Sequence, residues 1–370
     1  MKLIFIIGCL QGGGAEHVFA SLCNALSQRG HEIIAIYNYN NKDYELSEEV
    51  RQIDFNSIEY NTNEGNIISR YYKKTANRIR DFLFFKRIVK RERPQAVVSF
   101  MRNRAEILWL ACMGDVPLVF SEHSSMLRKP TTLLARFVRY VVMPQASAIT
   151  VLTESDKQYV QKELPRTVVM PNALSFSPIT EAEYIDSFAR RKHLFACGRL
   201  TPMKGFDNLI EAFSRIADKF PSWNLDIAGK DIVGGNHSKE LKKMVEAKGL
   251  IGRVNFIGYH TDVKSLMKAY SIYCLSSRSE GFSLTLTEAM ASGMATVSYD
   301  LSGPHEITRN NEDGLLVEDQ NIDALAEGMQ KLMIDEKLRY NLGLKAINNV
   351  KRFDSNIITD RWETFLSTLK

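Results

Sequence analysis

Short apolar runs alternate with stretches of helical periodicity along the whole chain. The apolar runs predict buried strands, whereas stretches such as Ala15–Arg29 and Asn103–Met113 repeat their apolar residues with the period of a helix. This alternation predicts parallel sheets with helices on both faces. The strands expected in the first half of the chain are Lys2–Gly8, Glu32–Asn38, Ala96–Phe100, Leu118–Glu122 and Ala148–Thr153.

The second half repeats this design after a polar run that begins near Pro171. We therefore expect an α/β fold with two Rossmann-like, doubly wound domains, residues 1–175 and 190–353, joined by a linker over 176–189 and facing a central cleft. The periodicity of a final helix within 354–370 leaves its partner open, and it can pack back on the first domain. Further strands are expected at His193–Cys197, Leu225–Ala228, Val254–Ile257, Ile272–Leu275, Thr296–Tyr299 and Gly314–Val317, with helices at Phe206–Lys219 and Asp323–Met333.

Length and composition agree with two globular domains. The chain has 370 residues, of which 45% are hydrophobic and 25% charged, so disorder is excluded as its main state. The five cysteines are scattered and form no Cys-x-x-Cys pair, which excludes a zinc ribbon and argues against a disulfide framework. This cysteine usage is typical of a cytoplasmic protein.

The apolar N-terminus has two readings, a signal peptide or a buried strand. It carries one charge, Lys2, and runs into Gly12-Gly13-Gly14 rather than a cleavage site, so we interpret it as a strand. No stretch of the sequence approaches the length of about 18 apolar residues that a membrane-spanning helix needs.

The glycine run at 12–14 follows this first strand and opens a helix. Such glycines let a ligand approach the backbone, and the helix N-terminus offers N–H groups to an anion, although a tight turn would explain them equally well. A dinucleotide-binding fingerprint is excluded, because His17 replaces its third glycine and the second strand ends near Asn38 without an acid.

Two further segments carry candidate chemistry in the second domain. Arg199 is expected to end a strand and Lys204 to begin a helix, which places two cations where a diphosphate needs neutralising, or where a turn is simply solvated. Glu280 and Glu288 flank the start of a helix expected over Leu284–Ala291. Their carboxylates suit sugar hydroxyls, but an acid pair at this spacing has little weight by itself.

The combination of motifs resembles the retaining nucleotide-sugar glycosyltransferases of family 4 (group 1 glycosyltransferases), which have the GT-B fold. The resemblance covers essentially the whole chain, although His17 stands where many relatives have Arg. It rests on Gly13 to Glu16, Ala196 to Gly205, the Glu-x7-Glu motif from Glu280 to Glu288, Ser302 to Ile307, and Asp313 to Val317.

The resemblance implies a role for each matching residue. Arg199 and Lys204 would hold the donor diphosphate and stabilise the departing nucleotide. Glu280 would contact the donor sugar, and Glu288 the ribose hydroxyls. His123 would lie near the sugar, with a structural role as the alternative for it and for its neighbour Glu122. The remaining residues implied to bind the donor are Gly13, Gly14, Gly281, Phe282, Ser283 and Leu284.

The chemistry of the reaction fits these roles. Negative charge grows on the diphosphate as the glycosyl bond breaks, so preorganised cations there stabilise the transition state. No Asp-x-Asp motif occurs, and we expect neither a metal nor a cofactor besides the nucleotide-sugar substrate. Retention of configuration is implied by the resemblance and not by any spacing of carboxylates.

One stretch holds the basic excess of the protein. The net charge is +5, and residues 66–93 contain ten Lys or Arg and only two acids, interleaved with aromatic residues. This pattern favours an anionic membrane surface, with a solvated helix as the alternative. No motif supports nucleic-acid binding. The residues expected to form this membrane and acceptor patch are Lys73, Lys74, Arg78, Lys86 and Arg87.

The sequence thus predicts a metal-independent, retaining glycosyltransferase that is peripheral on the inner face of the cell membrane. It would move a hexose or N-acetylhexosamine, with UDP as the expected nucleotide, to a lipid-linked glycan of a cell-surface polysaccharide such as O-antigen or capsule. A sugar-nucleotide epimerase of the same architecture and a non-catalytic scaffold are the alternatives.

Overall fold

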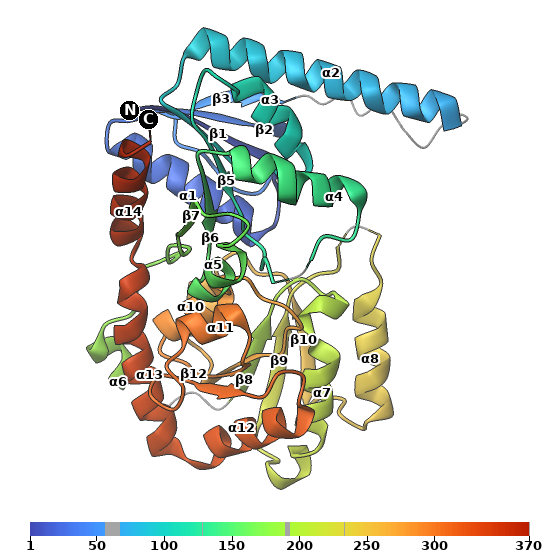
Figure 1. Ribbon diagram of the computed structural model, residues 1–370. Helices are drawn as coiled ribbons and strands as arrows, with labels where there is room; N and C mark the ends of the chain where they lie inside the picture. Colours follow the sequence, from blue (N-terminus) through green and yellow to red (C-terminus); the bar gives the residue numbers. More distant parts are fainter. Residues whose placement is uncertain (56–66, 128, 189–192, 233, 370) are drawn as a thin grey trace. The chain divides into compact units, whose positions relative to one another are not determined.

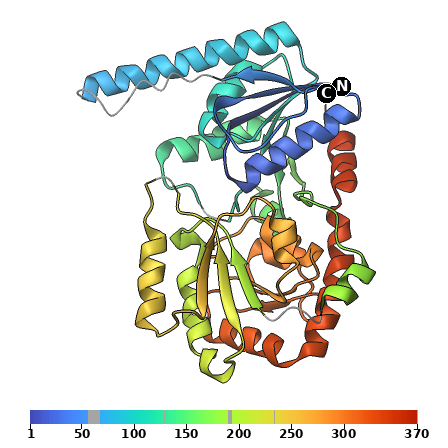
Figure 2. The ribbon, with the colours of Figure 1, turned by 180° about the vertical axis from the view of Figure 1, so that it is seen from behind.

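The computed structural model describes residues 1–55, 67–127, 129–188, 193–232 and 234–369. The chain divides into two compact units, Met1–Ala173 with Ser355–Lys370, and Leu174–Asp354. Each unit is built on its own parallel sheet, and Figures 1 and 2 show helices on both faces of each sheet. Within the described residues, no helix combines the length and apolar character needed to cross a membrane.

The first unit contains a seven-stranded sheet in the order β3-β2-β1-β4-β5-β6-β7, with every neighbouring pair parallel. Its interior strand β1 is buried on both faces, because Ile4 and Phe5 point into two different cores. The strands are β1 (Lys2–Leu10), β2 (Glu32–Lys42), β3 (Arg51–Asp54), β4 (Ala96–Ser99), β5 (Leu118–Ser121), β6 (Ala148–Val151) and β7 (Thr167–Val169).

The helices of the first unit include the last helix of the chain. Ile358, Trp362 and Leu366 of this helix belong to the same core as Phe5, and Arg29 donates to Glu363 over 3.0 Å. These contacts make it part of the first unit. The helices are α1 (Gly14–Gln28), α2 (Ile67–Glu92), α3 (Ala105–Cys112), α4 (Leu133–Phe137), α5 (Glu154–Val160) and α14 (Ser355–Ser367), with a π-helical turn at Val138–Val142 and 3-10 turns at Arg102–Arg104 and Met143–Gln145.

The second unit contains a six-stranded sheet in the order β10-β9-β8-β11-β12-β13, again parallel throughout. Its strands are β8 (His193–Cys197), β9 (Asn224–Ala228), β10 (Val254–Gly258), β11 (Ile272–Leu275), β12 (Ala295–Tyr299) and β13 (Leu315–Val317). Its helices are α6 (Glu181–Phe188), α7 (Phe206–Ser214), α8 (His237–Ala247), α9 (Val263–Met267), α10 (Leu284–Ala291), α11 (Ser302–Ile307), α12 (Ile322–Ile334) and α13 (Glu336–Val350), with 3-10 turns at Pro202–Lys204, Ala217–Lys219 and Lys351–Phe353.

Several elements differ from the sequence prediction. The predicted strands all form, but the edge strands β3 and β7 were missed, because they contain only four and three residues and β3 has a single apolar side chain. The segment expected as a linker contains α6, whose Tyr184 packs with Ile179 and Ile347 in the second unit. The helix expected over Phe206–Lys219 ends at Ser214 and resumes as a 3-10 turn.

Candidate active site

The candidate donor-site residues of the second unit gather at the carboxyl ends of its parallel strands. One loop follows β8 and carries Arg199 and Lys204, and another follows β11 and carries Glu280. β8 and β11 are neighbours in the sheet, so the two loops meet although they lie about 75 residues apart in the chain. This edge is where doubly wound sheets bind ligands.

Lys204 and Glu280 form an ion pair. The Lys204 Nζ lies 2.6 Å from Glu280 Oε1, and the same oxygen accepts from Ser277 Oγ over 2.6 Å. Glu280 is buried, and the Lys204 stem runs across Gly198, where a Cβ would lie 3.4 Å from its Cε. The pair thus joins the two loops through their side chains.

The local structure around the two cations differs from the prediction. β8 ends at Cys197, so Arg199 lies in the loop beyond it and is exposed. Lys204 ends a 3-10 turn, Pro202–Lys204, and Gly205 caps α7 in the left-handed region with φ of 62°. Pro202 favours this turn, since its ring fixes φ and supplies no N–H donor. In the described part of the chain, no ion pair involves Arg199.

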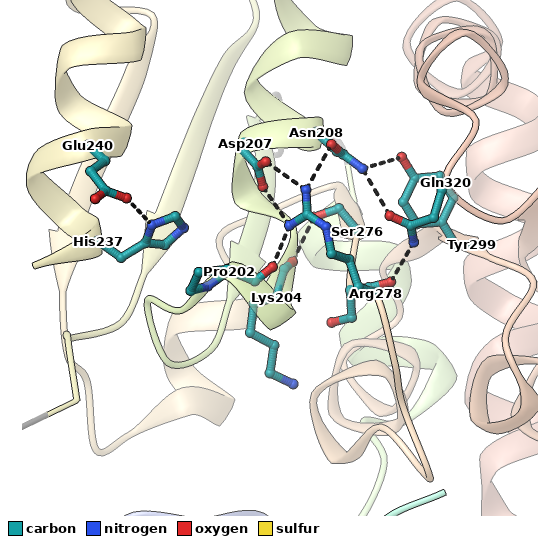
Figure 3. A network of polar contacts seen from close by, with 11 residues as sticks. Pro202, Lys204, Asp207, Asn208, His237, Glu240, Ser276, Arg278, Tyr299 and Gln320 are labelled. Carbon is teal, nitrogen blue, oxygen red and sulfur yellow. Dashed lines mark hydrogen bonds and ion pairs between the residues drawn. The ribbon is translucent and has the colours of Figure 1, made fainter. Parts of the chain in front are cut away.

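A network of polar contacts holds the Pro202–Lys204 turn against the loop that follows β11 (Figure 3). Arg278 donates to both carboxylate oxygens of Asp207, over 2.9 and 2.7 Å. Hydrogen bonding to Asp207 raises the pKa of the Arg278 guanidinium above its usual value. The side chain of Lys204 extends away from this network (Figure 3).

Glu288 lies inside α10, as the motif spacing predicts. Ser283 caps this helix by accepting from the Leu286 N–H over 3.3 Å, so Glu280 precedes the helix and Glu288 falls in its second turn. Glu288 Oε1 accepts from Ser175 Oγ over 2.5 Å. Burial raises the pKa of the Glu288 carboxyl to about 7, and the Ser175 hydrogen bond only partly opposes this shift.

The residues between the two acids contribute mainly through the backbone. Phe282 is buried and packs edge-to-face on Phe353, with ring centroids 5.2 Å apart, so its side chain anchors the loop in the core. Gly281 lies against Gly303, where an added Cβ would come within 3.0 Å of the Gly281 backbone. Leu284 is half-buried at the start of α10. A ligand at this loop would meet N–H groups rather than the Phe282 ring.

The glycine run of the first unit begins α1. Gly12 has φ of 60°, Gly13 is the N-cap and Gly14 is the first helical residue. The Glu16 carboxylate folds over Gly13, where a Cβ would lie 1.9 Å from Glu16 Oε2. A side chain at Gly13 would therefore displace the Glu16 carboxylate. Burial lowers the pKa of His17, so this residue does not supply the cation that an Arg would.

His123 lies in the loop after β5 and is held as a neutral ring. Its Nε2 is 3.0 Å from Ser121 Oγ, and its ring stacks on Phe100 with centroids 4.4 Å apart. Burial lowers its pKa to about 4, with Asn172 opposing part of the shift. The carboxylate of Glu122 is bound by Arg102, which favours a structural role for Glu122.

The predicted basic patch is partly neutralised. Arg78 pairs with Glu106 over 3.0 Å and Lys86 with Asp115 over 2.5 Å, both from or just after α3, while Arg87 is exposed. The side chains of Lys73 and Lys74 lie outside the described residues. Figure 1 shows α2 running past the edge of the sheet of its unit.

Two α/β units, each built on a parallel sheet, are the architecture of the GT-B fold. Two family models match the chain: "Glycosyltransferase Family 4" over residues 12–176 and "Glycosyl transferases group 1" over residues 182–349. The chain belongs to this family and is a glycosyltransferase with the GT-B fold.

Relatives and solved structures match over nearly the full length. A Campylobacter jejuni N-acetyl-D-galactosaminyltransferase that acts on a diphospho-undecaprenol-linked glycan is 28% identical, over 100% of this chain and 99% of its own. The lipopolysaccharide core glycosyltransferase LpsE of Rhizobium meliloti is 24% identical, over 96% of both. The crystal structure of Anabaena HepE with UDP and glucose superimposes with a TM-score of 0.80 at 18% identity, covering 100% of both chains.

Sequence reasoning missed the residues that hold the two site loops together through hydrogen bonds. Asp207, Ser277 and Arg278 make the contacts described above, and Ser276 Oγ donates to the Lys204 carbonyl over 3.1 Å, yet none of the four was singled out. Arg278 lies two residues before Glu280, the start of the Glu-x7-Glu motif, and Asp207 lies three residues after Lys204. Their proximity to two motifs was the available signal.

Proposed function

We propose that this protein is a retaining, metal-independent glycosyltransferase that moves a hexose or N-acetylhexosamine from a UDP-sugar to a hydroxyl of a lipid-linked glycan during cell-surface polysaccharide biosynthesis. The observation that carries the proposal is the Lys204–Glu280 pair at the carboxyl edge of the second sheet. It puts a cation for a diphosphate beside a carboxylate for sugar hydroxyls, in a protein of this family.

Lys204 and Arg199 serve the leaving group in this proposal. As the bond from the anomeric carbon to phosphate breaks, negative charge gathers on the diphosphate. The side chain of Lys204 is a flexible four-carbon stem, so its Nζ can move from Glu280 to a phosphate oxygen while the main chain stays in place. Arg199 is exposed and has its five donors available for the same group.

Glu280, Glu288 and His123 serve the sugar and the ribose. Glu280, released by Lys204, accepts from hydroxyls of the donor sugar, and Glu288 accepts from the ribose. His123 is neutral at physiological pH, with its Nε2 3.0 Å from Ser121 Oγ and its Nδ1 buried. We propose that its ring lies near the sugar, as the family resemblance implies. The N–H groups of Gly281 to Leu284 are proposed to complete the donor site of the second unit, and those of Gly13 and Gly14 are proposed as donor-binding groups of the first unit.

We propose retention because the family resemblance implies it, and metal independence because two cations are available for the diphosphate. A retaining glycosidase needs two carboxylates about 5 Å apart, as nucleophile and acid. Here Glu280 is engaged by two hydrogen-bond donors. We propose that the acceptor attacks on the face from which the diphosphate leaves, with a phosphate oxygen taking the proton of the acceptor hydroxyl. Lys204 and Arg199 compensate the charge that a divalent cation would otherwise compensate.

We propose that the protein associates peripherally with the membrane, where it meets its lipid-linked acceptor. The Campylobacter relative acts on an undecaprenol-linked glycan by its name, and the Rhizobium relative on lipopolysaccharide core. In this chain, α2 combines its cations with the exposed Ile79 and Leu83. α4 and the turn after it expose Leu133, at 84%, and Phe137 and Tyr140. Basic helices with exposed apolar residues bind anionic lipid surfaces.

A donor screen tests the proposed function. Purified protein is incubated with UDP-, GDP-, ADP- and dTDP-sugars, with and without a chelator, and both thermal stabilisation and nucleotide release are measured. We expect one UDP-sugar to raise the Tm, and release of UDP to depend on a lipid-linked acceptor and to be unaffected by chelator. Interconversion of the donor without nucleotide release would indicate an epimerase. Folded protein that no nucleotide sugar stabilises would contradict the proposal.

A further inference from the structure

We infer that Arg278 is a positioning residue for the proposed glycosyl transfer: it fixes the Pro202–Lys204 turn, and so directs Lys204 toward the donor diphosphate. This inference rests on the proposed function, because it assigns a task to the same site. Nothing in the known motifs of the sequence gives Arg278 a role, and it touches neither Lys204 Nζ nor the carboxylate of Glu280.

The three carbonyl groups of the turn are all bound by the loop that follows β11. The Arg278 guanidinium donates to the Pro202 carbonyl, and the Arg278 backbone N–H donates to the Met203 carbonyl over 2.8 Å. Ser276 Oγ donates to the Lys204 carbonyl over 3.1 Å. Three consecutive residues are therefore held by three donors from residues 276–278, so the main chain of Lys204 has little freedom to move.

The guanidinium ties this turn to the helix that follows it. One guanidinium nitrogen of Arg278 donates both to the Pro202 carbonyl and to Asp207 Oδ1 (Figure 3). The other donates to Asp207 Oδ2 and, over 3.3 Å, to Asn208 Oδ1. The planar fork of an arginine meets these acceptors together, which a lysine ammonium on its flexible stem does not.

Charge alone does not explain this arrangement. The side chains of Arg278 and Asp207 are 32% and 36% exposed, and exposed ion pairs of this kind stabilise a protein little. The number and direction of the acceptors instead indicate that Arg278 fixes the position of the Pro202–Lys204 turn. Gly205 agrees with this, since its Cα packs so closely on the Ser276 carbonyl that a Cβ would lie 2.0 Å from the oxygen. The two loops are fitted to each other at the residue after Lys204.

The loop that follows β11 therefore has two tasks in this proposal. Glu280 follows Arg278 by two residues, so the segment that holds the Lys204 main chain also carries the carboxylate that Lys204 contacts. Because the main chains that carry Lys204 and Glu280 are held together, only the Lys204 side chain must turn to meet a diphosphate. Displacing a charge-stabilising group by about 1 Å can cost about 100-fold in rate, even from a change remote from the reacting atoms.

The test is a double-mutant cycle between Arg278 and Lys204. Arg278→Gln, Lys204→Ala and the double variant are compared with the wild type for kcat, for KM of the donor, and for Kd of UDP and of uridine. We expect Arg278→Gln to lower kcat about tenfold or more and to weaken UDP but not uridine. In the Lys204→Ala background the same change should have little further effect on either quantity.

A matched control and a milder variant keep the result interpretable. Arg215 ends α7 and binds Asp323 and Glu211 on the surface of the same unit, so Arg215→Gln removes a similar ion pair away from the turn and should leave kcat unchanged. If Arg278→Gln does not fold, Arg278→Lys replaces it, with an intermediate loss expected because the charge remains without the fork.

The outcomes separate the inference from the proposed function. An unchanged kcat in Arg278→Gln, or an equal loss with and without Lys204, would overturn the positioning role while leaving the glycosyltransferase proposal intact. A wild type that releases nucleotide from no donor in the screen would instead overturn the proposed function, and this inference with it.

Discussion

Lys204 Nζ lies 2.6 Å from Glu280 Oε1, so the cation proposed for the diphosphate and the carboxylate proposed for the sugar neutralise each other without a ligand. Glu280 is 9% exposed and Lys204 22%, and a lone charge in such a place would be costly. The pair therefore keeps two charged groups in place until a donor offers each of them another partner.

Lys204→Ala is expected to lower turnover about 100-fold or more, as loss of a charge-stabilising donor typically does. Steady-state kinetics with the donor identified in the screen measure this. Lys248→Ala is the matched control, because Lys248 makes an equally short ion pair with Glu211 in the same unit and is 27% exposed. Equal activity of Lys204→Ala and Lys248→Ala would remove Lys204 from the site.

Gly205→Ala is expected to destabilise the protein more than Gly249→Ala. Both glycines have positive φ, 62° and 66°, so both substitutions carry a backbone strain of about 1–2 kcal/mol. Only at Gly205 would the new Cβ meet the Ser276 carbonyl, at 2.0 Å, whereas nothing lies within 4 Å at Gly249. Thermal unfolding of the two variants provides the measurement, and similar Tm values would show that the two loops are not closely packed.

Glu288 is expected to make stability fall as pH rises. Burial raises its pKa from 4.5 to about 7, so between these values the folded protein keeps a proton that the unfolded chain has released. Its contribution is therefore greatest below pH 4.5 and is lost as pH approaches 7. Glu288→Gln should remove this slope and raise the free energy of unfolding at pH 8 by on the order of 1–3 kcal/mol relative to the wild type.

Unfolding of both proteins between pH 5 and pH 8 checks this prediction. Ser175→Ala serves as a companion variant, since it removes the hydrogen bond that Glu288 accepts while leaving the carboxyl buried. It should move the pKa of Glu288 further upward. Parallel stability curves for the wild type and Glu288→Gln would contradict a raised pKa at this position.

The basic patch is expected to bind anionic vesicles. Changing four of its residues to Ser should weaken binding to phosphatidylserine-containing vesicles, because each cation near such a surface contributes about 1 kcal/mol. Cosedimentation at several salt concentrations measures this. The four residues are Lys73, Lys74, Lys86 and Arg87.

The control for this experiment removes the same charge elsewhere. Four exposed lysines of the second unit change to Ser, and binding should stay at the wild-type level; they are Lys239, Lys243, Lys331 and Lys337. If both quadruple variants bind vesicles as the wild type does, α2 is a solvated helix. The pairing of Lys86 with Asp115 makes Arg87 the larger contributor within the described part of the patch.

The parallel α/β class, most of the strands and the family could be predicted from the amino-acid sequence, because they depend on local periodicity and on motifs of a few residues. The start of α10 is an example: Ser283 caps it where the pattern places it, so the positions of Glu280 and Glu288 on either side follow from spacing alone.

The contacts between groups far apart in the chain could not be predicted from the sequence and are seen only in the folded protein. Lys204 and Glu280 are 76 residues apart, and their contact depends on β8 and β11 being neighbours, an order that no local pattern encodes. The same holds for the grip of Arg278 on Asp207, the packing of α14 on the first unit and the neutralisation of Lys86 by Asp115. Periodicity reports which face of an element is buried, whereas strand order and side-chain direction determine what that face, and each charge upon it, will contact.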